Sequence, residues 1–255
     1  MPAVTAGRRY FLVISLLLLA LVFLGFAPTF YLRSLFGRID DPTGSTRLPG
    51  HLIFHGLALT SWYALFCVQA ALVSVRKTGV HRKLGVAGAV SALAVITSGV
   101  VVLTNAVPRR IPDGVVPHPE LLEGFREVVL FQTFSLAVFA GCVGAAIYFR
   151  RQPDVHKRLM LIASVLLIPA ALSTNRDFGA ALQSVLPSFL AVGYTTDLLL
   201  ITSLLVFDLV KHRRLLATSI FGAVLLVLVR PVWMSLVVHS DLGIRWTNWL
   251  GRIPT

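Results

Sequence analysis

The sequence predicts an all-α fold, a bundle of seven transmembrane helices, and three observations support this prediction. Hydrophobic residues make up 56% of the 255 residues and charged residues only 13%, about half of the charge that a soluble domain carries. Mean hydropathy is +0.81, which fits neither a soluble globule nor a disordered chain. Seven apolar stretches approach the roughly 20 residues needed to cross the hydrocarbon core of a bilayer. Residues 1–255 are therefore interpreted as a single integral membrane domain.

The spans are predicted in chain order from these apolar stretches. The first follows Arg8 and Arg9 and is too long for a cleaved signal peptide, so it is expected to remain as a span. The fifth is the shortest and contains Pro169, which is tolerable because neighbouring helices can satisfy the carbonyl that it frees. Pro231 is expected to kink the seventh. The predicted spans are 10–32, 51–73, 84–106, 127–149, 159–175, 188–210 and 215–238.

The distribution of basic residues predicts the orientation. If the N-terminus is cytoplasmic, the segments on that side carry 13 basic and 2 acidic residues, whereas the opposite side carries 9 basic and 8 acidic residues. Lys and Arg concentrate on the cytoplasmic side of membrane proteins, so we expect a cytoplasmic N-terminus and an extracytoplasmic C-terminus in a bacterial inner membrane. The net charge of +12 then indicates the lipid bilayer and its anionic headgroups as partners, not nucleic acid.

An internal repeat is predicted from two matching turn sequences. Residues 73–84 and 148–159 share the pattern Val-His-basic-basic-Leu at an offset of 75 residues, without a gap, and the same offset superimposes Cys67 on Cys142. A shorter copy occurs at 211–215. We therefore predict one leading helix and three helical hairpins, with 51–97 equivalent to 126–172 and the histidine signature opening the third, fifth and seventh spans.

The histidines of this signature, His81, His156 and His212, form the first set of candidate ligands. If they lie together at the cytoplasmic rim, they can bind a metal ion, a haem propionate or an anionic lipid. The alternative is that they only begin helices at the interface, beside basic side chains that extend toward lipid phosphates.

A second set of polar residues falls in the extracytoplasmic half, where ionisable groups inside a span are costly and indicate a functional site. Asp197 and Arg230 lie at similar depth on consecutive spans, so we expect an ion pair that either only locks the hairpin or belongs to a ligand site. Tyr194 is one turn from Asp197 and is expected to point into the same cluster. The other candidate ligand-binding residues are Asn105, Glu127, Gln132, Arg176 and Asp177.

His51 and His55 are one helical turn apart at the start of the second span. Two imidazoles at this spacing suit a single metal ion, with a third ligand supplied by another segment. The glutamate that follows the first histidine in the metalloprotease motif is absent from residues 51–55. Both rings also lie near the predicted interface, where a histidine needs no ligand.

Three stretches carry a resemblance to known proteins. They are the segment from His51 and His55 to Gln69, residues 81–85 (His-Arg-Lys-Leu-Gly) and residues 155–160 (Val-His-Lys-Arg-Leu-Met). Together they resemble a broad group of bacterial multi-pass inner-membrane proteins that share a domain of unknown function. The last stretch is also similar to small membrane proteins of haem–copper oxidase assembly. The resemblance covers the second to fifth spans and implies a helical membrane bundle linked to haem or copper, but no catalytic residue.

Three functions are compatible with these features. The first is a membrane protein that binds haem or a transition-metal ion at the extracytoplasmic polar site, in respiratory-chain assembly or electron transfer, with another membrane protein as partner. The second is a small-solute transporter or receptor-like binder, which the buried polar residues, the prolines and the repeat favour. The third is a membrane-embedded hydrolase that uses a metal-bound water and needs three protein ligands. The sequence leaves open whether the protein is an enzyme.

Overall fold

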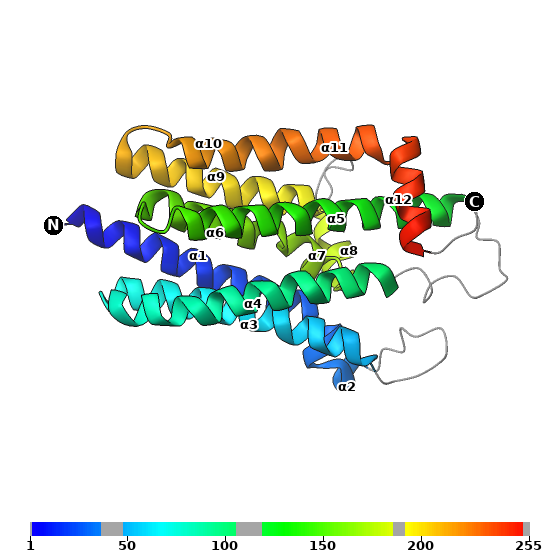
Figure 1. Cartoon of the computed structure of the whole chain (residues 1–255), viewed down its shortest axis with the longest axis horizontal. Helices are drawn as coiled ribbons and strands as arrows, with labels where there is room; N and C mark the ends of the chain where they lie inside the picture. The colour runs from blue at the N-terminus through cyan, green and yellow to red at the C-terminus, as the bar shows by residue number, and fades with distance from the viewer. Residues whose placement is uncertain (1, 37–47, 106–118, 186–191, 252–255) are drawn as a thin grey trace.

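The computed structural model describes residues 2–36, 48–105, 119–185 and 192–251, and within these ranges every regular element is helical. The long helices run side by side along the longest axis of the molecule (Figure 1). Their bounds are α1 Pro2–Phe26, η1 Ala27–Tyr31, α2 Arg33–Phe36, α3 Gly50–Ser74, α4 Thr78–Asn105, α5 Pro119–Tyr148, α6 Pro153–Leu166, α7 Ile168–Leu172, α8 Arg176–Val185, α9 Val192–His212, α10 Ala217–Ala223, η2 Val224–Val229, α11 Arg230–Val237 and α12 Asp241–Gly251.

Seven helical stretches of the described residues are long and apolar enough to cross a membrane. The second, third, fourth and sixth spans are the single helices α3, α4, α5 and α9. The first span combines α1 with the π-helical turn η1, the fifth combines α6 and α7, and the seventh combines α10, η2 and α11. They agree with the seven predicted spans. The fifth begins at Pro153, six residues earlier than predicted, because Lys157 and Arg158 are accommodated inside the helix and do not end it.

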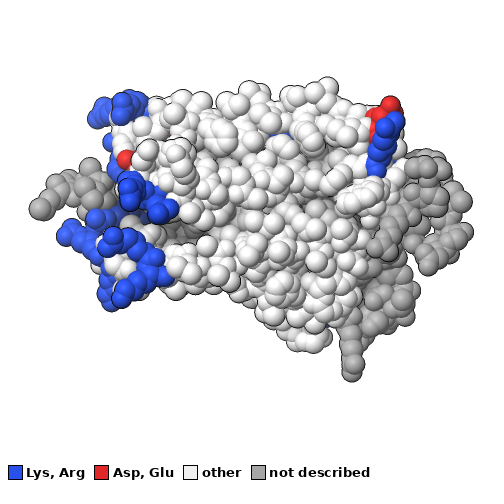
Figure 2. Space-filling model, viewed as in Figure 1, with Lys and Arg blue, Asp and Glu red and all other residues white. Residues whose placement is uncertain are grey.

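The chain reverses direction at one end of the bundle in the short turns between α3 and α4, α5 and α6, and α9 and α10, and the N-terminus lies at this same end (Figure 1). Lys and Arg gather there, and the face visible in Figure 2 carries almost no charge along the middle of the bundle. We call this end the basic end. It comprises Arg8, Arg9, Arg76, Lys77, Arg82, Lys83, Arg150, Arg151, Lys157, Arg158, Lys211, Arg213 and Arg214.

The fifth span is the centre of the bundle. In its membrane-length stretch 72% of the residues are buried, compared with 28–39% in the other six. Its helix is interrupted at Leu167 and resumes at Ile168. The interruption follows from Pro169, which has no N–H to donate to the carbonyl of Val165 and cannot continue the hydrogen-bond ladder. The consequence is a discontinuous helix at the most buried position of the fold.

The two segments of the predicted repeat match in the two helix limits that flank their connecting turn. The offset of 75 residues places the start of α4 at Thr78 on the start of α6 at Pro153, and the end of α3 at Ser74 within one residue of the equivalent end of α5 at Tyr148. The outer limits differ, because α3 begins at Gly50 and α5 at Pro119, 69 residues later, and because α4 continues for 28 residues whereas α6 ends after 14.

The third copy of the histidine signature does not open the seventh span, and that prediction is wrong. His212 is the last residue of α9, and the seventh span begins at Ala217 after a turn in which Arg213 has a positive φ of 55°. The chain therefore turns after His212. At His81 and His156, in contrast, the turn comes before the histidine. Pro231 lies in the first turn of α11, directly after the π-helical turn η2, so the helix adapts by widening one turn.

Two short amphipathic helices, α8 and α12, were not predicted. Figure 1 shows α12 lying across the bundle at the end opposite the basic end. It carries Trp246 and Trp249, whose rings pack 5.3 Å apart between centroids, and Trp246 donates a hydrogen bond to Thr133 of α5. Tryptophans are enriched at membrane–water interfaces, so α12 has the composition of a helix that lies at such an interface.

Candidate functional site

Side chains from two other helices bind the carbonyls beside the interruption between α6 and α7. The Tyr63 hydroxyl of α3 donates to the carbonyl of Ser164 at 2.6 Å, and Nη2 of Arg230 donates to the carbonyl of Leu166 at 3.3 Å. Buried carbonyls without partners are costly in an apolar interior. The interruption is therefore stabilised by hydrogen bonds from α3 and α11.

The neighbouring Trp62 strengthens the attachment of α3 to this region. Its Nε1 donates to the Ser164 hydroxyl at 3.2 Å, and its ring meets Phe139 of α5 edge to face. Trp62 and Tyr63 are 2% and 1% exposed. Neither residue was among the sequence-based candidates. Nothing in the sequence marks them, because their partners are a serine and a backbone carbonyl in the fifth span.

Asp197 of α9 and Arg230 of α11 form the predicted ion pair. Arg230 Nη1 donates to Asp197 Oδ2, and the two side chains are 5% and 1% exposed. The guanidinium also lies 4.9 Å from the centroid of the Phe131 ring of α5, a cation–π contact that gains strength when it is desolvated. Arg230 thus contacts α9, α5 and the interrupted fifth span at once.

The Asp197–Arg230 pair leaves hydrogen-bonding capacity unused. Asp197 Oδ1 and Arg230 Nε are buried and have no hydrogen-bond partner among the described residues. Such groups are costly in a low-dielectric interior and in native proteins often mark a bound water, ion or ligand. The pair thus retains one unused acceptor and one unused donor, which bound polar groups can satisfy.

A second buried ion pair lies at the basic end and was not predicted. Arg158 of α6 donates through Nη2 to Oδ1 of Asp208 on α9, and both side chains are fully buried. Ser219 of α10 donates to Asp208 Oδ2 at 2.6 Å and accepts from Arg158 Nε at 3.1 Å. The backbone N–H of Leu216 donates to Oδ2 at 3.3 Å, and Asp154 accepts from Arg158 Nη1 at 3.2 Å. The Arg158–Asp208 pair thus connects the fifth, sixth and seventh spans.

One sequence signal could have led to this second pair. Asp154 and Asp208 are the two acidic residues in segments that carry 13 basic ones. Asp208 lies inside an otherwise apolar stretch of the sixth span, where an ionisable group requires a partner. A search for that partner among the neighbouring basic residues would have included Arg158.

The other predicted ligand-binding residues whose side chains the structure describes are more exposed than the pair. Tyr194 is partly exposed, three residues before Asp197, and Gln132 is partly buried on α5. Asn105 is exposed at the end of α4 and bonds the carbonyl of Val101 in its own helix. Glu127 of α5 and Asp177 of α8 are also exposed, and the side chain of Arg176 lies outside what the structure describes.

The predicted metal pair His51 and His55 lies on α3, with both rings partly buried. His55 Nδ1 is within 2.9 Å of the hydroxyl of Ser98 on α4, so this ring connects α3 to α4. Among the described residues no group of three or more His, Cys, Asp or Glu is arranged to hold a metal ion.

The structure brings two of the three rim histidines together. The rings of His81 on α4 and His156 on α6 meet edge to face, with centroids 6.4 Å apart. His156 Nδ1 is 2.8 Å from the carbonyl of Ala146 on α5, and His81 Nδ1 is buried without a hydrogen-bond partner in the described chain. His212 instead packs against Phe207 of its own helix.

Comparisons with known proteins provide no functional assignment, so any assignment rests on the geometry described above. No family model matches the chain, and neither a curated protein nor a solved structure is significantly similar to it.

Proposed function

We propose that this protein is a transporter of a small polar solute, with the Asp197–Arg230 pair as its binding element. The observation that carries the proposal is a buried ion pair, closed onto an interrupted helix, that retains one unused acceptor and one unused donor. Transporters commonly bind substrates near the membrane midplane at helices that are broken there. A purely structural pair has no need of unused polar groups.

The proposal includes the arrangement in the membrane. The basic end lies on the cytoplasmic side of a bacterial inner membrane, where its arginines and lysines contact anionic headgroups. The N-terminus is then cytoplasmic and the C-terminus extracytoplasmic. Hairpins 51–97 and 126–172 are duplicates, and the matching helix limits at their connecting turns support this origin.

Accessibility of the pair to water tests the proposal. Cys67 and Cys142 are first replaced by Ala, and Ser164 at the interruption is then replaced by Cys. In a transporter, a small membrane-impermeant thiol reagent added to one side of the membrane reaches Cys at position 164 in at least one conformation. The matched control is Ser15→Cys, a buried serine of α1 that bonds within its own helix, and it remains unlabelled. If position 164 is unlabelled from both sides, the bundle is rigid and the proposal is wrong.

A transport assay then tests the pair directly. Proteoliposomes are exposed to a panel of labelled amino acids, monocarboxylates and amines. At least one solute should enter faster than in protein-free liposomes, and Asp197→Asn should abolish this excess. Asp241→Asn, the same substitution at an exposed carboxylate of α12, is the control that keeps it.

Metal binding is a second candidate function, favoured by the His81–His156 contact. Two imidazoles bound to one tetrahedral metal ion at about 2.1 Å place their ring centres roughly 5 to 5.5 Å apart, so the two rings, whose centres are 6.4 Å apart, would move about 1 Å closer on binding. A bond from His156 Nδ1 to a backbone carbonyl fixes the tautomer with a free Nε2, as in many metal-ligating histidines. The two imidazoles supply half of a tetrahedral ligand set, with water in the other positions.

Titration with Co²⁺ and Zn²⁺ distinguishes this candidate from the transport site. Purified protein should bind one ion, with Co²⁺ giving visible absorption bands, and His81→Gln or His156→Gln should each remove it. His212→Gln is the matched control at the same end. If binding survives both substitutions but is lost in His51→Gln or His55→Gln, the metal site lies on α3. If the protein shows neither stoichiometric metal nor haem absorbance, metal and haem binding are excluded.

A further inference from the structure

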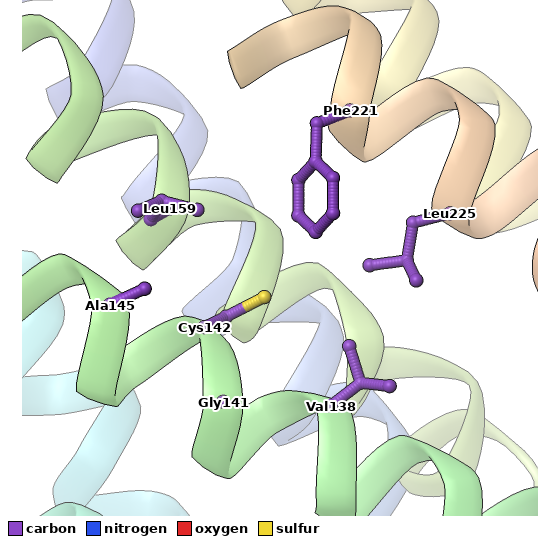
Figure 3. Close-up of a pocket in the computed structure, with 7 residues that line it drawn as sticks. All are labelled: Val138, Gly141, Cys142, Ala145, Leu159, Phe221 and Leu225. Atoms are coloured by element: carbon purple, nitrogen blue, oxygen red, sulfur yellow. The ribbon is translucent and has the colours of Figure 1, made fainter.

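A lateral apolar groove lies between α5, α6 and the α10–η2 segment. It encloses about 220 Å3 and is lined by Val138, Gly141, Cys142, Ala145, Leu159, Phe221 and Leu225. Figure 3 shows the Cys142 thiol and the Phe221 ring directed into the space between the helices. No lining side chain carries a charge, so the groove fits hydrocarbon and not a polar solute.

The groove exists because the α5 face that lines it consists of small residues. Gly141 and Ala145 lie four residues apart on this face, with Cys142 beside them. Opposite, Phe221 and Leu225 reach only partway across the gap. A Cβ added at Gly141 meets no atom within 4 Å, so the space beside it is open. Gly141 and Phe221 are both exposed, and the groove therefore opens on the side of the bundle that faces the bilayer.

Positive charge flanks the groove where its helices reach the basic end. The turn that joins α5 to α6 carries Arg150 and Arg151, and the turn that joins α9 to α10 carries Arg213 and Arg214; all four are exposed. Ala145 is five residues from Arg150, about 7.5 Å along the helix axis, within the reach of an extended arginine. The acidic residue of the first turn region, Asp154, is paired with Lys157 and Arg158.

We propose that this groove binds one acyl chain of an anionic phospholipid, whose phosphate is held by the arginines of residues 150–151 and 213–214. An apolar chain-sized groove below two arginine pairs matches the two parts of such a lipid, and basic pockets between transmembrane helices are known anionic-lipid sites. Arginine suits phosphate because its fork of N–H donors bonds two oxygens at once. The lipid fills the gap between α5 and α10 and thereby joins the second predicted hairpin to the third.

Lipid retention measured by native mass spectrometry tests the proposal. The purified protein is exchanged into phosphatidylglycerol or into phosphatidylcholine with identical acyl chains. One phosphatidylglycerol should remain bound, and phosphatidylcholine should be lost. Gly141→Leu, which fills the groove, should weaken retention of phosphatidylglycerol. The double variant Arg150→Gln/Arg214→Gln should also weaken it, by roughly tenfold or more, because each basic residue near a membrane surface strengthens the binding of anionic lipid several-fold.

Two matched controls accompany these variants. Gly85→Leu adds the same side chain at an exposed glycine of α4 that also meets no atom within 4 Å, and Arg76→Gln/Arg82→Gln removes two charges from the turn region between α3 and α4. Both should retain the lipid as the wild type does.

The reaction of Cys142 with an apolar maleimide gives a second measurement, in a Cys67→Ala background. Phosphatidylglycerol should slow the reaction relative to phosphatidylcholine. Equal retention of the two lipids would overturn the proposal in favour of unspecific apolar contact. Retention that is unaffected by Gly141→Leu would mean that only the headgroup binds, and a dimer in which Cys142 is protected would assign the groove to a second copy of the chain.

Discussion

Asp197 and Asp208 lie on the same face of α9, about three helical turns apart, and each is paired with a buried arginine. Both arginines involve α6 of the fifth span, since Arg158 lies in its second turn and Arg230 bonds the carbonyl of its last residue, Leu166. Ile201 and Leu204, which lie between the two aspartates, are buried and apolar. The sixth span is thus attached to the centre of the bundle at two depths, with buried apolar side chains between them. In the proposed transporter, opening toward one side requires one of these pairs to separate.

The Asp197–Arg230 pair predicts a non-additive effect on stability. Arg230→Met leaves the carboxylate of Asp197 unpaired in a low-dielectric interior and should destabilise the protein by about 3–5 kcal/mol. Asp197→Leu should have a similar effect. The double variant should be closer to the wild type, because it leaves no isolated charge. Thermal unfolding in detergent measures the three variants, and additive losses would show that the two charges do not depend on each other.

The Arg158–Asp208 pair predicts different effects at two positions that the proposed repeat makes equivalent. Lys83 and Arg158 are 75 residues apart, but Lys83 is exposed and Arg158 is fully buried. Arg158→Met should destabilise by about 3–5 kcal/mol, since it leaves Asp208 buried without its cation. Lys83→Met should stay within about 0.5 kcal/mol, as substitutions at exposed sites do. Equal effects in thermal unfolding would mean that burial of the arginine does not determine its contribution.

The predictable part of this structure depends on hydropathy and on charges inside apolar stretches. Apolar length alone identifies the seven spans, because a bilayer imposes a minimum length on every helix that crosses it. The Asp197–Arg230 pair was predictable for a related reason, since neither charge has a partner of opposite sign within its own predicted span and each therefore requires one from another helix.

Features that depend on contacts between distant helices were not predictable. Tyr63 and Trp62 act through a backbone carbonyl and a serine of the fifth span, and such partners leave no pattern in the sequence. Arg158 was interpreted as one of many basic residues at a membrane surface, because its own position does not distinguish it from Lys83; only Asp208 indicates that one of these basic residues has a buried partner. His212 was misplaced because its local sequence repeats a helix start although the chain turns after it.

The proposed orientation predicts the outcome of reporter fusions. Reporters fused after Leu84 and after Leu159 follow the turns of the basic end and should be cytoplasmic. Fusions at Pro117 and Thr255, which lie outside the described residues, should be extracytoplasmic. Alkaline phosphatase and a fluorescent protein give complementary signals on the two sides. A periplasmic signal from the Leu84 or Leu159 fusion would invert the whole arrangement.

The contact between α1 and α7 predicts a strong effect of one methyl group. At Gly25, a Cβ would lie 2.4 Å from the carbonyl oxygen of Ala171 and 2.7 Å from its carbonyl carbon. Hydrogen bonds hold the two backbones at this distance, because Thr174 donates to the carbonyl of Gly25 and Asn175 to that of Leu24, both at 2.8 Å. Backbone atoms cannot move away as a flexible side chain can, and small residues at such crossings allow the helices to approach.

Gly25→Ala should therefore force α1 away from α7 and break these two hydrogen bonds, with a loss of about 1–3 kcal/mol or more from overpacking. Gly88→Ala is the matched control, because a Cβ there meets no atom within 4 Å, and alanine is the better helix former by about 1 kcal/mol. The melting temperature in detergent should fall for Gly25→Ala and stay level or rise for Gly88→Ala. If both variants gain stability, α1 packs less closely on α7 than the described hydrogen bonds require.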